Sequence, residues 1–165
     1  MDFTHLHLIL NHFPIIGTII AVFILIYGIY KSYLPIQKVS LALIVVLAII
    51  AIPVFLTGEP AEEAVENLPG VSELVIEAHE EAAEASIWVM EFTGILAFIA
   101  LLLIAGKKQF ATTSVYLVVL AGLLSFVMMA RTGYLGGQIR HTELNGSVVQ
   151  TSAESVSGSD KEEDD

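Results

Sequence analysis

Three histidines fall within eight residues near the start of the chain, in the stretch HLHLILNHFPIIG at residues 5–17. His5, His7 and His12 stand where a strongly apolar segment begins. Imidazole nitrogens coordinate transition metals and haem iron, and they also form hydrogen bonds with polar neighbours. The stretch therefore predicts either a metal centre or a set of polar anchors at the edge of a membrane.

The other candidates for chemistry lie far along the chain. His79 stands in the acidic stretch EAHEEAAEAS, and His141 closes the glycine-rich stretch RTGYLGGQIRH. Arg131 and Arg140 bring positive charge to that second stretch, and guanidinium groups suit carboxylates, phosphates and haem propionates. Glu91 lies inside an apolar segment, where an ionisable group is a functional candidate by default.

The first hypothesis from these residues is a b-type haem that transfers electrons. A four-helix bundle can hold a cofactor between side chains on facing helices. His12 with His141 or His79 would supply the axial ligands. Arg131 or Arg140 would pair with the propionates.

Two other hypotheses stay open. The second is a divalent metal ion, because imidazole and carboxylate together suit Zn, Cu, Fe or Ni. Its ligands would be His12, His79, His141 and Glu91. The third is a structural or assembly subunit of a membrane complex, with no cofactor. The histidines would then form hydrogen bonds at the membrane edge or respond to pH.

Long apolar segments must position these residues, since the chain is 55% hydrophobic with a mean hydropathy of +0.76. Four segments are long enough to cross a bilayer, which takes about 20 residues. They cover residues 13–33, 39–56, 86–105 and 110–130. The fold class that we predict is therefore all-α, a four-helix transmembrane bundle. The chain has no cysteine, which excludes disulfides, thiolate metal sites and iron–sulfur clusters.

Basic residues predict how the bundle lies in the membrane. Lys31 and Lys38 follow the first span, Lys107 and Lys108 follow the third, and neither loop holds an acid. The positive-inside rule places both loops in the cytoplasm. Both termini and the acidic loop between the second and third spans would then lie outside, on the periplasmic side of a bacterial inner membrane.

The segments outside the spans also carry local signals. The acidic loop is rich in helix formers, and we expect a short helix at residues 60–68. Ser72 would cap a second helix that runs on into the third span. Asn11 is expected to cap the first span, with His5 and His7 on an interfacial segment before it.

The chain divides into two parts by composition. Residues 1–144 would form the four-span membrane domain. Residues 145–165 are rich in serine, glycine and acids, with few apolar side chains, and we expect this tail to be disordered.

The chain resembles a family of uncharacterised bacterial four-helix membrane proteins. The resemblance lies in HLHLILNHFPIIG at the first span, LTGEPAEEAVENLPGVSE after the second and GGQIRHTE after the last. It extends to about Glu143 and implies the same four-span fold. It also implies that His12 and His141 are candidate functional residues. The family carries no established activity, so the resemblance implies no function.

Other function classes find little support. The chain has no nucleophile elbow, phosphate-binding loop or dinucleotide fingerprint, so we expect no enzyme activity from it alone. A net charge of -11 argues against nucleic acid as a partner. The expected partner is the lipid bilayer, with either other membrane-complex subunits or further copies of the chain.

Overall fold

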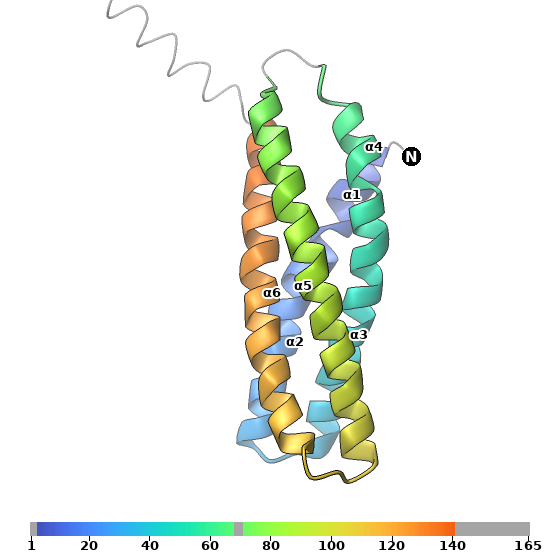
Figure 1. The fold of residues 1–165 in the computed structure, drawn as a ribbon, viewed down its shortest axis with the longest axis vertical. Coiled ribbons are helices and arrows are strands. Elements are labelled where there is room, and N and C mark those ends of the chain that lie inside the picture. Colours follow the sequence, from blue (N-terminus) through green and yellow to red (C-terminus); the bar gives the residue numbers. More distant parts are fainter. Residues whose placement is uncertain (1–2, 68–70, 141–165) are drawn as a thin grey trace, which may run out of the picture.

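The chain folds into long helices, as the computed structural model in Figure 1 shows. The structure describes residues 3–67 and 71–140. Its helices are α1 (Phe3–Leu10), α2 (His12–Tyr30), α3 (Leu34–Leu56), α4 (Gly58–Glu63), α5 (Glu73–Ala105) and α6 (Ala111–Arg140).

The long helices are built to lie in lipid. Helical stretches at residues 7–30, 34–63, 73–105 and 111–139 are long and apolar enough to cross a membrane. Their outward faces expose large apolar side chains such as Phe23. A water-soluble protein of this size would bury such side chains, whereas lipid solvates them. The all-α four-span prediction is confirmed, and the chain is a multi-pass membrane protein.

The two ends of the bundle differ in charge. One end holds the α2–α3 and α5–α6 connections, with Lys31 and Lys107 among their lysines, and we call it the basic end. The other holds α1, α4 and the first turns of α5, and we call it the acidic end. Figure 1 shows α1 beside α4 at that end. The placement of the acidic end outside the cell stays a prediction.

Small residues let the helices approach closely. A Cβ atom added at Gly94 of α5 would lie 2.5 Å from the Cβ of Ala48 on α3. One added at Gly122 of α6 would lie 2.6 Å from Cγ2 of Val22 on α2. Apolar burial drives helix association weakly in lipid, so close van der Waals contact between small residues must supply much of the attraction. These glycines therefore set the spacing of the bundle.

Buried hydroxyl groups join the helices by hydrogen bonds. Ser40 of α3 donates to the carbonyl of Ala21 on α2. Thr93 of α5 and Ser125 of α6 lie 2.8 Å apart, oxygen to oxygen, and both are fully buried. Such contacts satisfy polar groups that lipid cannot satisfy, and they fix which helix faces meet.

The structure corrects the predicted start of the first span. Asn11 does not cap α2, because its side chain makes no capping hydrogen bond. Instead the chain is already helical before it, and the Asn11 backbone N–H donates to the His7 carbonyl at 2.9 Å. The predicted cap is wrong because residues 3–10 form α1 and leave no free helix start at this point.

Other boundaries also differ from the sequence prediction. The short acidic helix begins at Gly58 and ends at Glu63, instead of covering residues 60–68. The helix after it runs unbroken from Glu73 to Ala105, as predicted, although Ser72 makes no side-chain capping hydrogen bond. The last helix continues to Arg140, nearly three turns beyond the predicted span. The predicted tail at 145–165 lies outside the described residues.

We expect Gly94→Ala to destabilise the bundle by about 1–3 kcal/mol, because its new methyl group would overlap Ala48. Gly137→Ala is the matched control, since a Cβ there meets nothing within 4 Å. The control should leave stability unchanged or raise it by up to about 1 kcal/mol, through helix propensity. Unfolding by SDS in mixed micelles measures both. Equal effects of the two substitutions would contradict the packing argument.

Because the chain lacks cysteine, single introduced cysteines can test its orientation. Glu66→Cys lies at the acidic end and Gln109→Cys at the basic end, and both positions are exposed. In intact bacterial spheroplasts, a membrane-impermeant maleimide should label position 66 alone, and lysis should open position 109 to labelling. The reverse pattern would show that the positive-inside prediction is wrong.

Candidate functional site

A cavity of about 560 Å³ lies between the helices at the acidic end. It is lined by residues from α1 to α6, so the whole bundle contributes to it. Along α5 its wall changes from Glu77 near the helix start to Met90, over about 20 Å at about 1.5 Å per residue. The cavity is therefore a funnel that descends toward the bundle core.

The wall of the funnel is polar at the mouth and apolar at depth. Ile15, Ile87, Met90 and Met129 form part of the deep wall. The glutamates among the lining residues are Glu59, Glu62, Glu77, Glu80, Glu81 and Glu84. Among the residues that the structure describes, no lysine or arginine lines the funnel. Its mouth therefore attracts cations, and its depth suits an apolar body.

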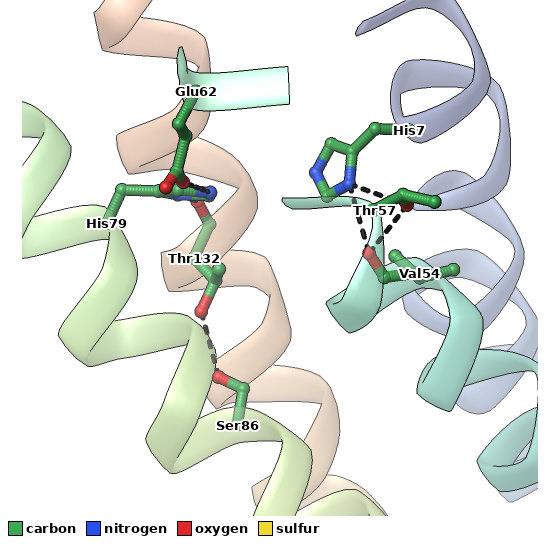
Figure 2. A network of polar contacts seen from close by, with 7 residues as sticks. All are labelled: His7, Val54, Thr57, Glu62, His79, Ser86 and Thr132. Carbon is green, nitrogen blue, oxygen red and sulfur yellow. Dashed lines mark hydrogen bonds and ion pairs between the residues drawn. The ribbon is translucent and has the colours of Figure 1, made fainter. Parts of the chain in front are cut away.

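His7 reaches the funnel from α1. Its Nδ1 lies 3.1 Å from the Val54 carbonyl oxygen and 3.3 Å from Oγ1 of Thr57, at the end of α3 (Figure 2). The Thr57 hydroxyl itself donates to the Val54 carbonyl at 2.9 Å. A carbonyl oxygen only accepts, so Nδ1 of His7 carries the proton and donates. These contacts hold α1 against the end of α3.

His79 reaches the funnel from α5 and is buried, with a relative exposure of 8%. Its Nδ1 lies 3.0 Å from the Thr132 carbonyl oxygen on α6. The same reasoning places the proton on Nδ1. A Cβ added at Gly136 would lie 2.9 Å from Cε1 of the ring, so only glycine leaves room for the imidazole there. Gly136 of α6 therefore leaves the space that the His79 ring occupies.

Both histidines thus present the same nitrogen to the funnel. With Nδ1 bound to a backbone carbonyl, the neutral ring keeps its lone pair on Nε2. Figure 2 shows the His7 and His79 rings extending toward each other from opposite sides. A carbonyl that holds Nδ1–H is the usual support for a metal-ligating histidine, because it fixes the tautomer and the ring orientation.

Glu62 of α4 meets His79 across the mouth of the funnel. Its Oε1 lies 3.5 Å from Nε2 of His79, and both side chains are largely buried, at 14% and 10% relative exposure. A carboxylate and an imidazole lone pair repel each other unless a proton lies between them. The contact is therefore favourable only when a proton lies between the two groups, and a cation that binds here would take the place of that proton.

Three more polar side chains, those of Ser86, Thr132 and Asn11, complete the site. Ser86 of α5 and Thr132 of α6 lie 2.8 Å apart, oxygen to oxygen, below the His79 contact. The side-chain oxygen of Asn11, which also lines the funnel, is buried without a hydrogen-bond partner. It is a free acceptor, and burial of an unsatisfied amide oxygen is costly.

The structure disperses the residues that the sequence singled out. His12 is exposed, does not line the funnel, and donates from Nδ1 to the Leu8 carbonyl at the end of α1, at 2.7 Å. Glu91 lies outside the funnel, and its Oε1 is buried without a hydrogen-bond partner. Of these residues, only His79 lines the funnel.

Of the basic and C-terminal candidates, Arg131 does not line the funnel. Arg131 is exposed on α6, next to Thr132. For Arg140 the structure describes the backbone at the end of α6, and His141 lies outside the described residues.

His7 is the residue whose role the sequence interpretation missed. Spacing held a usable signal, because His7, Asn11 and Pro14 follow at intervals of four and three residues, which is one helix face. All three line the funnel. The alternative pairing of His5 with His12, seven residues apart, fits the same helix period, and only tertiary contacts distinguish the two faces.

The arrangement presents two imidazole side chains, those of His7 and His79, to one cavity. Within residues 3–67 and 71–140, no group of three or more His, Asp or Glu side chains is placed to hold an ion. His7 and His79 therefore suit a centre that brings other ligands of its own.

The chain was also compared with known proteins. No protein-family model, curated protein or solved structure matches it.

We expect Thr132→Val to destabilise the bundle by about 1 kcal/mol, because the Ser86 hydroxyl loses its partner at the helix interface. Thr113→Val, at an exposed position of the same helix, is the control and should change stability little. SDS unfolding compares the two variants. A larger loss for Thr113→Val would contradict the role given to the Ser86–Thr132 contact.

Proposed function

We propose that this membrane protein binds b-type haem in the funnel and transfers electrons, with His7 and His79 as axial ligands. The observation that carries the proposal is the pair of imidazoles. They come from different helices, both anchor Nδ1 on a backbone carbonyl, and both present Nε2 to one cavity. In this proposal His79 stays a ligand, as the sequence predicted, and His7 takes the place of His12.

The ligand count and the size of the funnel both support haem. A porphyrin supplies four nitrogens to its iron, so two imidazoles complete the coordination. A bare ion needs more protein ligands than the described residues bring together. A cavity of about 560 Å³ also lies within the usual range for small-molecule and cofactor sites, about 300–1,000 Å³. Haem would supply the redox chemistry, and the protein would hold it and limit its contact with water.

The acidic mouth is the main electrostatic cost of this proposal. Haem propionates are anionic, and the described lining of the funnel offers them six glutamates and no lysine or arginine. Arg131 is exposed on α6, next to Thr132, which lines the funnel. We propose that its guanidinium pairs with a propionate at the mouth. Glu62 would also have to leave Nε2 of His79.

A divalent transition-metal ion is the second candidate, and the same acidic mouth favours it. His79 and Glu62 lie 3.5 Å apart, atom to atom, as two ligands of one ion do. Water would fill the remaining positions. Binding would release the shared proton, so affinity would fall as the pH is lowered.

The test is a visible absorption spectrum of the protein, purified in mild detergent from bacteria supplied with a haem precursor. We expect a Soret band that shifts on reduction with dithionite. His7→Ala and His79→Ala should each abolish the low-spin spectrum, because one axial ligand is lost. His12→Ala is the matched control and should keep it, since His12 lies outside the funnel.

Elemental analysis of the same samples separates the alternatives. A colourless protein rules out haem. About one equivalent of Zn, Cu, Ni or Fe that Glu62→Ala removes would then support the ion. A protein with neither cofactor would support the third hypothesis, an assembly subunit of a membrane complex.

A further inference from the structure

A second cavity lies at the opposite end of the molecule, on the surface between α2 and α3. It is a groove of about 530 Å³ that Phe23, Ile24 and Tyr27 of α2 line on one side. Pro35, Ile36 and Val39 of α3 line the other side. Its walls are apolar and face outward, so within a membrane a lipid chain can enter it.

Helices α2 and α3 are joined beside the groove. Gln37 donates from Nε2 to the Gly28 carbonyl at 3.1 Å and joins the two helices there. A Cβ added at Gly28 would lie 3.0 Å from both Gln37 and Ile36 side-chain atoms. The helices therefore touch at Gly28 and leave the groove preformed beside that contact.

Positive charge lies at the water-facing end of the groove. The Lys31 ammonium lies 6.0 Å from the ring centre of Tyr27, which lines the groove, and 5.0 Å from that of Tyr30. These cation–π contacts hold the ammonium one helix turn beyond the apolar walls. Lys38, next to Val39, is exposed on the facing helix. No Asp or Glu occurs between residues 13 and 58.

We propose that this groove binds one anionic phospholipid, with an acyl chain between α2 and α3 and the phosphate at Lys31 and Lys38. Apolar walls with Lys31 one helix turn beyond Tyr27 and Lys38 next to Val39 match the apolar chain and the charged headgroup of such a lipid. Anionic lipids attract basic side chains near the membrane surface. A second copy of the chain fits less well, because it would bring the same lysines against each other. The proposal is independent of the function proposed for the funnel.

The test offers the purified protein equal amounts of phosphatidylglycerol and phosphatidylcholine with identical acyl chains. Native mass spectrometry then counts the lipids retained. We expect the wild type to prefer phosphatidylglycerol. Lys31→Gln and Lys38→Gln should each lower that preference about fivefold, as expected for one basic side chain near an anionic headgroup.

Two further variants make the result specific. The double variant Lys107→Gln, Lys108→Gln removes two charges from the other loop of the basic end, and should keep most of the preference. Val39→Trp fills the groove at an exposed position without a change of charge, and should lower retention of both lipids. Equal retention of the two lipids by the wild type would overturn the proposal. So would an equal loss from the two lysine pairs, or a specific dimer in place of bound lipid.

Discussion

Close contact between small residues is the constraint on which the rest of the structure depends. Lipid solvates apolar side chains as well as a protein core does, so the helices gain little by hiding them from it. Gly94 against Ala48 and Gly122 against Val22 instead allow backbones to approach until many weak contacts add up. The hydroxyl pair of Thr93 and Ser125 then fixes the rotation of α5 against α6.

The funnel lies at the acidic end, where the long helices no longer pack closely against each other. At the acidic end α1 lies beside α4, and all six helices contribute to the wall of the funnel. Polar groups replace small residues there. Val54 and Thr132 offer carbonyls to the two histidines, and Glu62 closes the mouth against His79. The tightly packed helices thus support a site at the acidic end, where His7 and His79 face the funnel.

The two ends of the bundle carry opposite charges, which makes the molecule asymmetric across the membrane. Glutamates line the funnel mouth, whereas the connections at the other end carry lysines without acids. The same separation that predicts the orientation in the membrane also sets the ligand chemistry of each cavity. One cavity attracts cations at its mouth, and the other ends in cations that suit a phosphate.

Local sequence patterns determined much of the fold. Apolar runs of bilayer length can form only helices in lipid, so the four spans and the all-α class could be predicted. Helix ends were less predictable. Asn11 looks like a cap, yet the helix before it removes the free N–H groups that a cap would bind. The unbroken passage from Glu73 to Ala105 was predictable, because no Pro or Gly interrupts its first turns.

The residues of the candidate site could be predicted only in part from the sequence. It identified imidazole chemistry near the start of the chain, and it identified His79. It favoured His12 over His7, and spacing could not correct this choice, because a helix of either rotation satisfies the same spacing. That choice depends on which face of α1 meets α3, and so on contacts between residues nearly fifty positions apart, such as His7 with Val54. Composition and periodicity act within a helix, whereas the site is made between helices, where only the tertiary structure decides.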